Sequence, residues 1–229
     1  MEIIHVVFIR NTRSKNNPIA DIVNQLATEQ IKLGLKAGIW EISRRSTEQF
    51  QNKAYPVKHF SHHLFIWNTM KEIRKHLMKT GTNSIFHFHG GIVPVYYPIA
   101  FYLQENKIPF ILSPHGRYNL HTMGQASYLK KKHLENFDQN LINWSSALHF
   151  NSEQERKELL SLFPFYLQKS YICPNGLINN NLNIAPKIMK HDEIIYCFNG
   201  ELNNTEMGID ILLHGFAKFK KNHANNAIL

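Results

Sequence analysis

The sequence predicts an α/β fold built on a parallel β-sheet. Short apolar runs alternate with longer segments of helical periodicity, which is the order of elements that a parallel sheet requires. The clearest example is an apolar run at 84–89, a helical segment at 95–105 and a second apolar run at 108–113. Two strands joined by a helical crossover form a βαβ unit, and ligands bind just beyond the carboxyl ends of such strands. We therefore expect the functional site at these strand ends.

Four elements are expected before this unit. They are a strand, a helix, a strand and a helix, at 3–9, 18–33, 37–42 and 64–79. Asn17 followed by Pro18 has the composition of a helix N-cap and a first-turn proline. The weakly patterned stretch 43–63 is interpreted as a surface loop, with a short strand at 57–60 as the alternative. It contains three histidines without evident partners, His59, His62 and His63.

The segment after the unit is expected to complete one domain and to begin another. A loop, a helix, a strand, a helix and a short strand are expected at 117–126, 127–144, 147–150, 153–162 and 171–173. Ser152 with Glu155 forms a capping box at the start of the second helix. The polar segment 177–192 is interpreted as a linker. A strand, a helix and the start of another strand follow at 193–198, 209–216 and 227–229.

Composition narrows the classes of partner. The chain has 229 residues, of which 43% are hydrophobic, and this content supports a packed core. Its net charge of +9 favours an anionic partner, such as a phosphorylated small molecule, an acidic membrane face or nucleic acid. The run Lys130-Lys131-Lys132 is short and is interpreted as a solvated helix face. Because no nucleic-acid recognition motif accompanies it, nucleic acid is not expected as a partner.

The sequence also indicates the compartment. Its two cysteines, Cys173 and Cys197, lie in different apolar runs without the spacing of a disulfide framework or a zinc site, which fits a reducing setting. The amino terminus has no signal-peptide pattern, and no apolar run approaches the length of a membrane span. We therefore expect a soluble, cytoplasmic protein.

At the carboxyl end of each strand of the βαβ unit stands a histidine that is followed by glycine. His89 precedes Gly90-Gly91, and His115 precedes Gly116. Glycine lets the backbone approach a ligand closely, and histidine supplies a donor, an acceptor or a proton. An ordinary turn is the alternative for each pair. His87 and His89 share one face of their strand, as two metal ligands would, but no Cys, Asp or Glu lies nearby to complete the set, so no metal is expected.

Five motifs, in order, resemble those of the family-four glycosyltransferases of GT-B fold. They are HFHGG at 87–91, IPFILSPHG at 108–116, SSALHFNSEQE at 145–155, ICPNG at 172–176 and FNGELNNTEMGIDILLHGFA at 198–217. The resemblance implies an α/β fold of two facing Rossmann-like domains with a cleft between them. It implies a complete acceptor-side domain at 1–176, a linker at 177–192, and only the first strand and helix of the donor-side domain at 193–229. The chain thus resembles a family member truncated within its second domain.

The resemblance also implies an activity. Such enzymes transfer a sugar, with retention, from a nucleotide diphosphosugar to a glycan or lipid-linked acceptor in polysaccharide biosynthesis, and they need no metal or other cofactor. His115 matches the catalytic histidine beside the transferring sugar. His89, Gly90 and Gly91 match the acceptor side. Peripheral contact of the protein with an anionic face of the inner membrane is also expected. On the donor side, the matching positions near the diphosphate are Gly200, Glu201, Met207 and Gly208.

Two of these donor positions depart from the family pattern. Glu201 and Met207 stand where the family has an arginine and a lysine that contact the diphosphate. A carboxylate there replaces attraction by repulsion. The alternative function is therefore a catalytically inactive remnant that keeps an acceptor-binding module. A second chain that completes the carboxyl-terminal domain is a further partner to expect.

Overall fold

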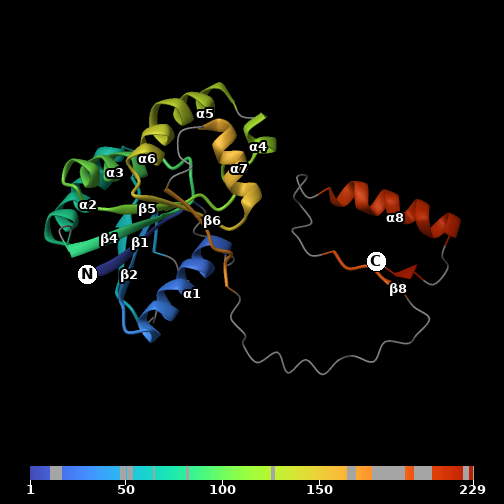
Figure 1. Cartoon of the computed structure of the whole chain (residues 1–229), viewed down its shortest axis with the longest axis horizontal. Helices are drawn as coiled ribbons and strands as arrows, with labels where there is room; N and C mark the ends of the chain where they lie inside the picture. The colour runs from blue at the N-terminus through green and yellow to red at the C-terminus, as the bar shows by residue number, and fades with distance from the viewer. Residues whose placement is uncertain are drawn as a thin grey trace. The chain divides into compact units, whose positions relative to one another are not determined.

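The computed structural model of the chain describes two compact units, Met1–Ile178 and Asn179–Leu229 (Figure 1). The described residues are 1–10, 17–46, 50, 54–63, 65–80, 83–124, 127–163, 169–176, 194–198, 208–223 and 227–228. The segment 177–192, interpreted as a linker, lies outside them. No helix in this described part is both long and apolar enough to cross a membrane.

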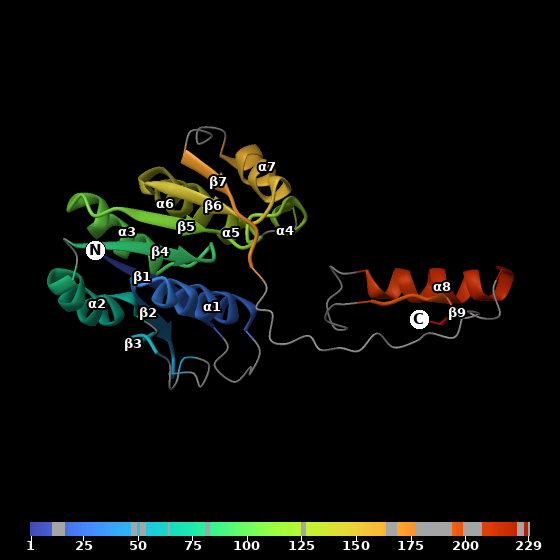
Figure 2. The same cartoon turned by 60° about the horizontal axis from the view of Figure 1, so that its bottom comes forward.

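The first unit is built on a seven-stranded sheet, which confirms the predicted α/β class. The strand order is β3-β2-β1-β4-β5-β6-β7, and each neighbouring pair is parallel (Figure 2). The strands are β1 (Glu2–Ile9), β2 (Lys36–Ser43), β3 (Val57–Ser61), β4 (Ser84–His89), β5 (Phe110–Ser113), β6 (Ala147–Phe150) and β7 (Ser170–Ile172). Because all strands run the same way, their carboxyl ends share one edge of the sheet.

The helices pack on the two faces of this sheet unequally. They are α1 (Pro18–Lys32), α2 (Ile66–Thr80), α3 (Tyr96–Glu105), α4 (Leu120–Gly124), α5 (Tyr128–His133), α6 (Gln139–Trp144) and α7 (Glu153–Leu162). Side chains of α2, α3, α6 and α7 join one large apolar cluster with Val6, Phe86 and Leu112 of the sheet. Val23 of α1 belongs to a smaller cluster with Val7 on the opposite face (Figure 1). The α1 face of β4, β5 and β6 therefore remains available for polar side chains.

Sequence signals explain why α1 begins where it does. Asn17 is the N-cap, and its side-chain oxygen accepts hydrogen bonds from the backbone N–H groups of Ile19 and Ala20 at 3.1 and 3.2 Å. Pro18 follows as the first helical residue, where its missing N–H costs nothing. The predicted cap is confirmed.

Two local expectations are wrong. The stretch 57–61, interpreted as surface loop, forms the edge strand β3, because Phe60 points into the core while polar neighbours on the exposed edge hide the strand pattern. His59 and His62 also have partners: Nε2 of His59 lies 3.1 Å from Oγ of Ser43, and the ring of His62 packs edge-on against Phe8. The expectation that these histidines stand alone is therefore wrong.

The region 117–144 is more broken than the sequence predicts. The expected loop 117–126 contains the short helix α4, and the expected helix 127–144 divides into α5, a π-helical turn (Leu134–Asp138) and α6. A π-helical turn adds a residue to the helical repeat and re-aims the side chains that follow. Here it accompanies the buried carboxylate of Asp138.

The second unit is small. In its described part, β8 (Ile194–Ile195) pairs in parallel with β9 (Ala227–Ile228), and α8 (Ile209–His223) lies between them in sequence. The rings of Tyr196, Phe216 and Phe219 contact one another with centroids 5.5 to 6.3 Å apart. Ile211 and Leu213 remain exposed on α8.

The first unit should fold without the second. In a chain that ends after Gly176, all seven strands are kept, so we expect the same circular dichroism spectrum and a melting temperature within about 4 °C, the shift that corresponds to about 1 kcal/mol. A control chain that ends after Phe163 loses β7 and should melt clearly lower. If the chain ending at Gly176 unfolds or aggregates more than the full chain, the second unit is required for the fold.

Candidate functional site

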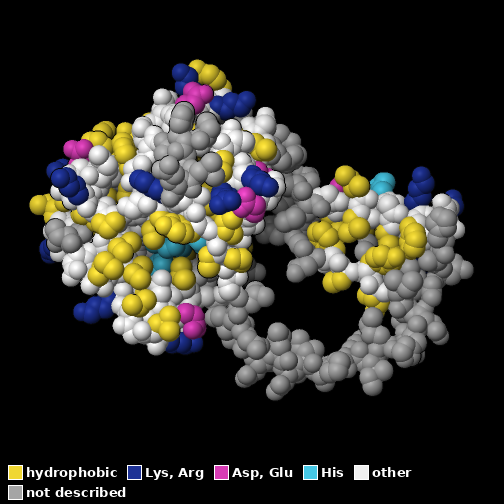
Figure 3. Space-filling model, viewed as in Figure 1, with side chains coloured by type: hydrophobic (Ala, Val, Ile, Leu, Met, Phe, Trp, Pro, Cys, Tyr) yellow, Lys and Arg dark blue, Asp and Glu magenta, His cyan; other side chains and the backbone are white. Residues whose placement is uncertain are grey.

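Five histidines meet on the α1 face of the sheet. His5 lies on β1, His87 and His89 on β4, His115 two residues beyond the end of β5, and His149 on β6. The parallel register places His5 beside His87, and residues two apart on a strand share a face. Figure 3 shows histidine side chains at the surface of the first unit among hydrophobic ones. The topology thus concentrates imidazoles near the carboxyl edge of β4, β5 and β6.

Three of these histidines form a continuous series of polar contacts, which we call the histidine chain. Nε2 of His5 lies 2.8 Å from Oε1 of Gln30 on α1, and Nδ1 of His5 lies 2.9 Å from Nε2 of His89. Nδ1 of His89 lies 3.0 Å from Nε2 of His115. Nδ1 of His115 lies 3.4 Å from the amide nitrogen of Asn151. The chain connects the buried face of α1 with the carboxyl edge of the sheet.

A second series contains the other two histidines. Nε2 of His87 lies 2.6 Å from Oγ of Ser113, and that oxygen lies 2.7 Å from Nδ1 of His149. Nε2 of His149 donates to the backbone carbonyl of Cys173 at 2.7 Å. This series runs across β4, β5 and β6 to the residue after β7. It holds the rings of His87 and His149 in fixed orientations.

Burial keeps the inner histidines neutral. Desolvation lowers the pKa of His5, and it lowers the pKa values of His87 and His89 well below the usual range, with neighbouring histidines adding to the effect. Desolvation also lowers the pKa of His115 to about 4, with smaller contributions from His149 and Arg117. These four imidazoles are therefore neutral at neutral pH.

The structure supplies a third histidine where the sequence indicated no further metal ligand. Ring nitrogens of His5, His87 and His89 all lie within 4.8 Å of one another. The expectation that no residue could complete the set is wrong, because β1 brings His5 from 82 residues away in sequence. However, Nδ1 of His5 and Nε2 of His89 are 2.9 Å apart, closer than the roughly 3.3 Å between two nitrogens on a tetrahedral zinc ion. The absence of a bound metal remains a prediction.

A strained turn presents His115. Its φ angle is +52°, in the left-handed region that a non-glycine residue seldom adopts, and Gly116 follows at +73°. Glu155 holds the turn, because Oε1 accepts from the N–H of Gly116 at 2.6 Å and Oε2 accepts from the N–H of Asn151 at 2.8 Å. The predicted capping box is half confirmed: Ser152 caps α7 through the N–H of Glu155. Glu155 instead links the start of α7 to the turn after β5.

The two predicted acceptor-side glycines have different structural roles. Gly90 has a φ angle of +97°, which favours glycine in the turn after β4. A Cβ atom on Gly91 would lie 2.5 Å from Cζ of Tyr118, so Gly91 makes room for a buried ring. The structure thus places His89 beside His115, joins the N–H of Gly90 to the carbonyl of Ser113, and gives Gly91 a packing role.

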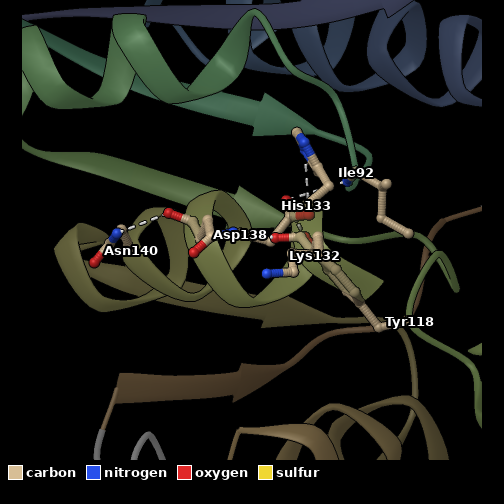
Figure 4. A network of polar contacts seen from close by, with 7 residues as sticks. Ile92, Tyr118, Lys132, His133, Asp138 and Asn140 are labelled. Carbon is tan, nitrogen blue, oxygen red and sulfur yellow. Dashed lines mark hydrogen bonds and ion pairs between the residues drawn. The ribbon is translucent and has the colours of Figure 1, made fainter. Parts of the chain in front are cut away.

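The side chain of Asp138 contacts the loops that follow β4 and β5 (Figure 4). Its Oδ1 accepts from the hydroxyl of Tyr118 at 3.0 Å and from the N–H of Ile92 at 3.3 Å, and its Oδ2 lies 3.5 Å from Nε2 of His133. Desolvation raises the pKa of Asp138 to about 6, although these two hydrogen bonds lower it. The carboxyl group therefore connects the loops after β4 and β5 to the π-helical turn.

The predicted donor-side residues are mostly outside the described part. Gly200, Glu201 and Met207 are not among the described residues. Gly208 is described: its φ angle is +63°, and its carbonyl accepts from the N–H of Leu212 at the start of α8. It opens the helix at the position that the resemblance implies.

Sequence reasoning missed several residues of the site. His149 and Asn151 stand at the end of a predicted strand, so the rule that ligands bind at carboxyl ends could have found them. A histidine inside the apolar run 3–9 was the available signal for His5. Gln30 had no signal, because helical periodicity does not distinguish it from the other polar residues of α1.

The first unit should lose stability as the pH falls from about 7 to about 5. Each buried histidine has a lowered pKa in the folded state, so the unfolded chain takes up protons first. For His115, whose pKa is about 4 when folded and 6.5 when unfolded, the loss at pH 5 is about 2 kcal/mol. Urea unfolding of the wild type and of His115→Asn at both pH values measures it, since Asn also tolerates a positive φ angle.

The difference between the wild type and His115→Asn isolates the contribution of His115 to the pH dependence of stability. Asp138 has the opposite effect, because a raised carboxyl pKa loses its stabilising contribution as the pH rises, but it is present in both proteins. We expect the drop in unfolding free energy to be about 2 kcal/mol smaller in His115→Asn. An equal drop in both would show that His115 is not held neutral.

Comparisons with known proteins indicate the family of the chain. Residues 20–178 match the profile of the family described as Glycosyltransferase Family 4. No protein of curated function matches the sequence significantly.

Two solved structures share the fold. The apo form of the lipopolysaccharide outer core galactosyltransferase WaaB superposes with a TM-score of 0.59 at 10% identity, over 95% of this chain and 58% of that one. The S. aureus MnaA–UDP co-structure superposes with a TM-score of 0.54 at 11% identity, over 76% of this chain and 44% of that one. The chain thus spans about half the length of both. The profile match covers most of the first unit and well over half of the chain, so the chain belongs to glycosyltransferase family 4.

Proposed function

We propose that the protein serves in the retaining transfer of a sugar from a nucleotide diphosphosugar to a glycan or lipid-linked acceptor, with the acceptor side on the first unit. Family membership supports the class of reaction. The observation that supports its location is His115, a neutral imidazole on a strained turn at the carboxyl edge of the sheet. Strain of this kind persists where the surrounding structure holds it, and it is concentrated at functional sites.

The chemistry of the edge suits a sugar. A neutral imidazole exchanges hydrogen bonds with hydroxyl groups without attracting a counter-ion. The leaving diphosphate, in contrast, needs positive charge as the glycosidic bond breaks. Arg117 is exposed two residues after His115 and is close enough to lower its pKa. Arg117 is therefore our candidate for the cation that contacts the diphosphate beside the transferring sugar.

The second candidate function is an inactive remnant that binds acceptor only. It is favoured by one observation, the presence of Glu201 and Met207 where family members carry cations toward the diphosphate. A second chain that covers the exposed Ile211 and Leu213 of α8 is the partner that we propose for this case. Donor binding distinguishes the two functions.

If the chain is an inactive remnant, it should bind nucleotide diphosphosugars weakly. With a carboxylate near the diphosphate, we expect titration calorimetry with uridine and guanosine diphosphosugars to give dissociation constants no tighter than about 1 mM, or about −4 kcal/mol. Glu201→Arg replaces repulsion by a charge-assisted contact and should tighten binding by about tenfold or more. Micromolar binding by the unaltered chain would contradict the remnant and support the proposed sugar transfer.

We also propose a peripheral contact with an anionic membrane at the cytoplasmic face, made by α2. Trp67 and Met78 are 79% and 72% exposed on this helix, and three exposed cations, Lys71, Arg74 and Lys75, lie between them in sequence. A shallow hollow along the helix is lined by these five side chains together with Met70. Exposed apolar side chains among cations are typical of helices that lie on anionic bilayers.

Vesicle binding tests this surface. The full chain should co-sediment with phosphatidylcholine vesicles that contain phosphatidylglycerol, and much less with phosphatidylcholine alone. Each cation near an anionic surface contributes about 1 kcal/mol, so Lys71→Ala with Arg74→Ala should weaken binding by about tenfold or more. Lys131→Ala with Lys132→Ala on α5 is the matched control. Equal loss in both double variants would show that α2 is not the contact surface.

A further inference from the structure

The side-chain amide of Gln30 is the inner partner of the histidine chain. It determines which group donates and which accepts in each hydrogen bond of the chain. Gln30 presents Oε1 to His5, and an amide oxygen only accepts hydrogen bonds. His5 therefore carries its proton on Nε2 and donates it to Gln30. Because the imidazole is neutral, Nδ1 of His5 has a lone pair and must accept.

The role of each ring nitrogen as donor or acceptor then determines that of the next ring. Nδ1 of His5 accepts, so His89 donates to it from Nε2 at 2.9 Å, and Nδ1 of His89 becomes an acceptor. His115 then donates to that nitrogen from Nε2 at 3.0 Å. The last acceptor is Nδ1 of His115, which faces the amide nitrogen of Asn151. One proton arrangement therefore satisfies all four contacts.

We propose that Gln30 is a positioning residue for His115: through the histidine chain it holds His115 in the Nε2–H tautomer, so that Nδ1 is a fixed acceptor for a sugar hydroxyl at the sheet edge. The identity of the ligand rests on the proposed function, whereas the tautomer does not. Gln30 is not itself catalytic, because its amide contacts His5, two rings away from His115.

The inner end of the chain controls the direction because its contact is stronger. The Gln30 contact is 2.8 Å long, and the Asn151 contact is 3.4 Å long. His5 and His89 are almost fully buried, so bulk water does not compete for their ring nitrogens. A weak partner at the edge is also easily displaced, which leaves Nδ1 of His115 available to a ligand.

Asn151 supports the same chemistry. Its Oδ1 is buried and has no hydrogen-bond partner among the described residues. An acceptor without a donor costs about 1 to 3 kcal/mol, which a ligand hydroxyl would relieve. Nδ2 of the same side chain lies 3.4 Å from Nδ1 of His115, so the two acceptors belong to two residues in contact. Such a pair selects hydroxyl donors and disfavours phosphate or carboxylate groups.

Imidazole nitrogen NMR on the full chain, labelled with ¹⁵N-histidine, tests the proposal. Long-range ¹H–¹⁵N correlation distinguishes the two neutral tautomers, and His→Asn variants assign the signals. We expect Nε2–H tautomers for His5, His89 and His115. An Nδ1–H tautomer at His115 in the wild type would overturn the proposal by itself, even if none of the Gln30 variants folded.

Two substitutions with opposite chemistry sharpen the test. Gln30→Glu keeps an acceptor and should leave the three tautomers unchanged. Gln30→Lys offers only donors, so it should invert the chain and move the proton of His115 to Nδ1. Gln25→Lys, a matched change on the same helix outside the histidine chain, should leave His115 as in the wild type. No response of His115 to Gln30→Lys in a folded protein would refute control by Gln30.

Ligand titrations separate this inference from the proposed function. Methyl glycosides should shift the Nδ1 signal of His115, and inorganic phosphate should not. A shift with phosphate alone would overturn the assignment of a hydroxyl ligand. No shift with either probe, combined with inversion by Gln30→Lys, would count against the proposed function while supporting control of the tautomer.

Discussion

The site depends on the hydrogen bonds that buried imidazoles make with one another. An unpartnered polar group in a dry interior is costly, and a charged one costs more. His5, His87 and His89 are buried on the α1 face of an otherwise apolar sheet. Hydrogen bonds of their ring nitrogens offset the cost of burying these polar groups. Burial also keeps the rings neutral, which avoids the larger cost of a buried charge. This constraint links a helix, four strands and two loops into one arrangement.

The fold could largely be predicted from the sequence, since apolar runs and helical periodicity depend on neighbouring residues. Strands at 84–89 and 108–113, and the Asn17 cap, follow from such local signals. Edge strand β3 was only the alternative to a surface loop, because just one of its side chains is fully buried. The π-helical turn was missed because the contacts of Asp138 with Tyr118 and Ile92 come from distant loops.

The candidate site could be predicted only in part. His89 and His115 were identified because strand ends and glycines mark them, and the structure brings them into contact. His5 and Gln30 were not, because strand order rather than spacing places His5 beside β4, and helix packing places Gln30 against His5. Gly91 matched a motif, yet its neighbour Tyr118 explains it through packing. Local sequence therefore indicates the edge of the site, and tertiary structure supplies its interior.

We propose that the neutral His115 at the sheet edge receives a sugar hydroxyl. The most direct measurement is a crystal structure of the full chain with a bound methyl glycoside. We expect a hydroxyl oxygen about 2.7 to 3.2 Å from Nδ1 of His115, with a second hydroxyl near Oδ1 of Asn151. A glycoside bound away from the carboxyl edge, or a phosphate group at that nitrogen, would contradict it.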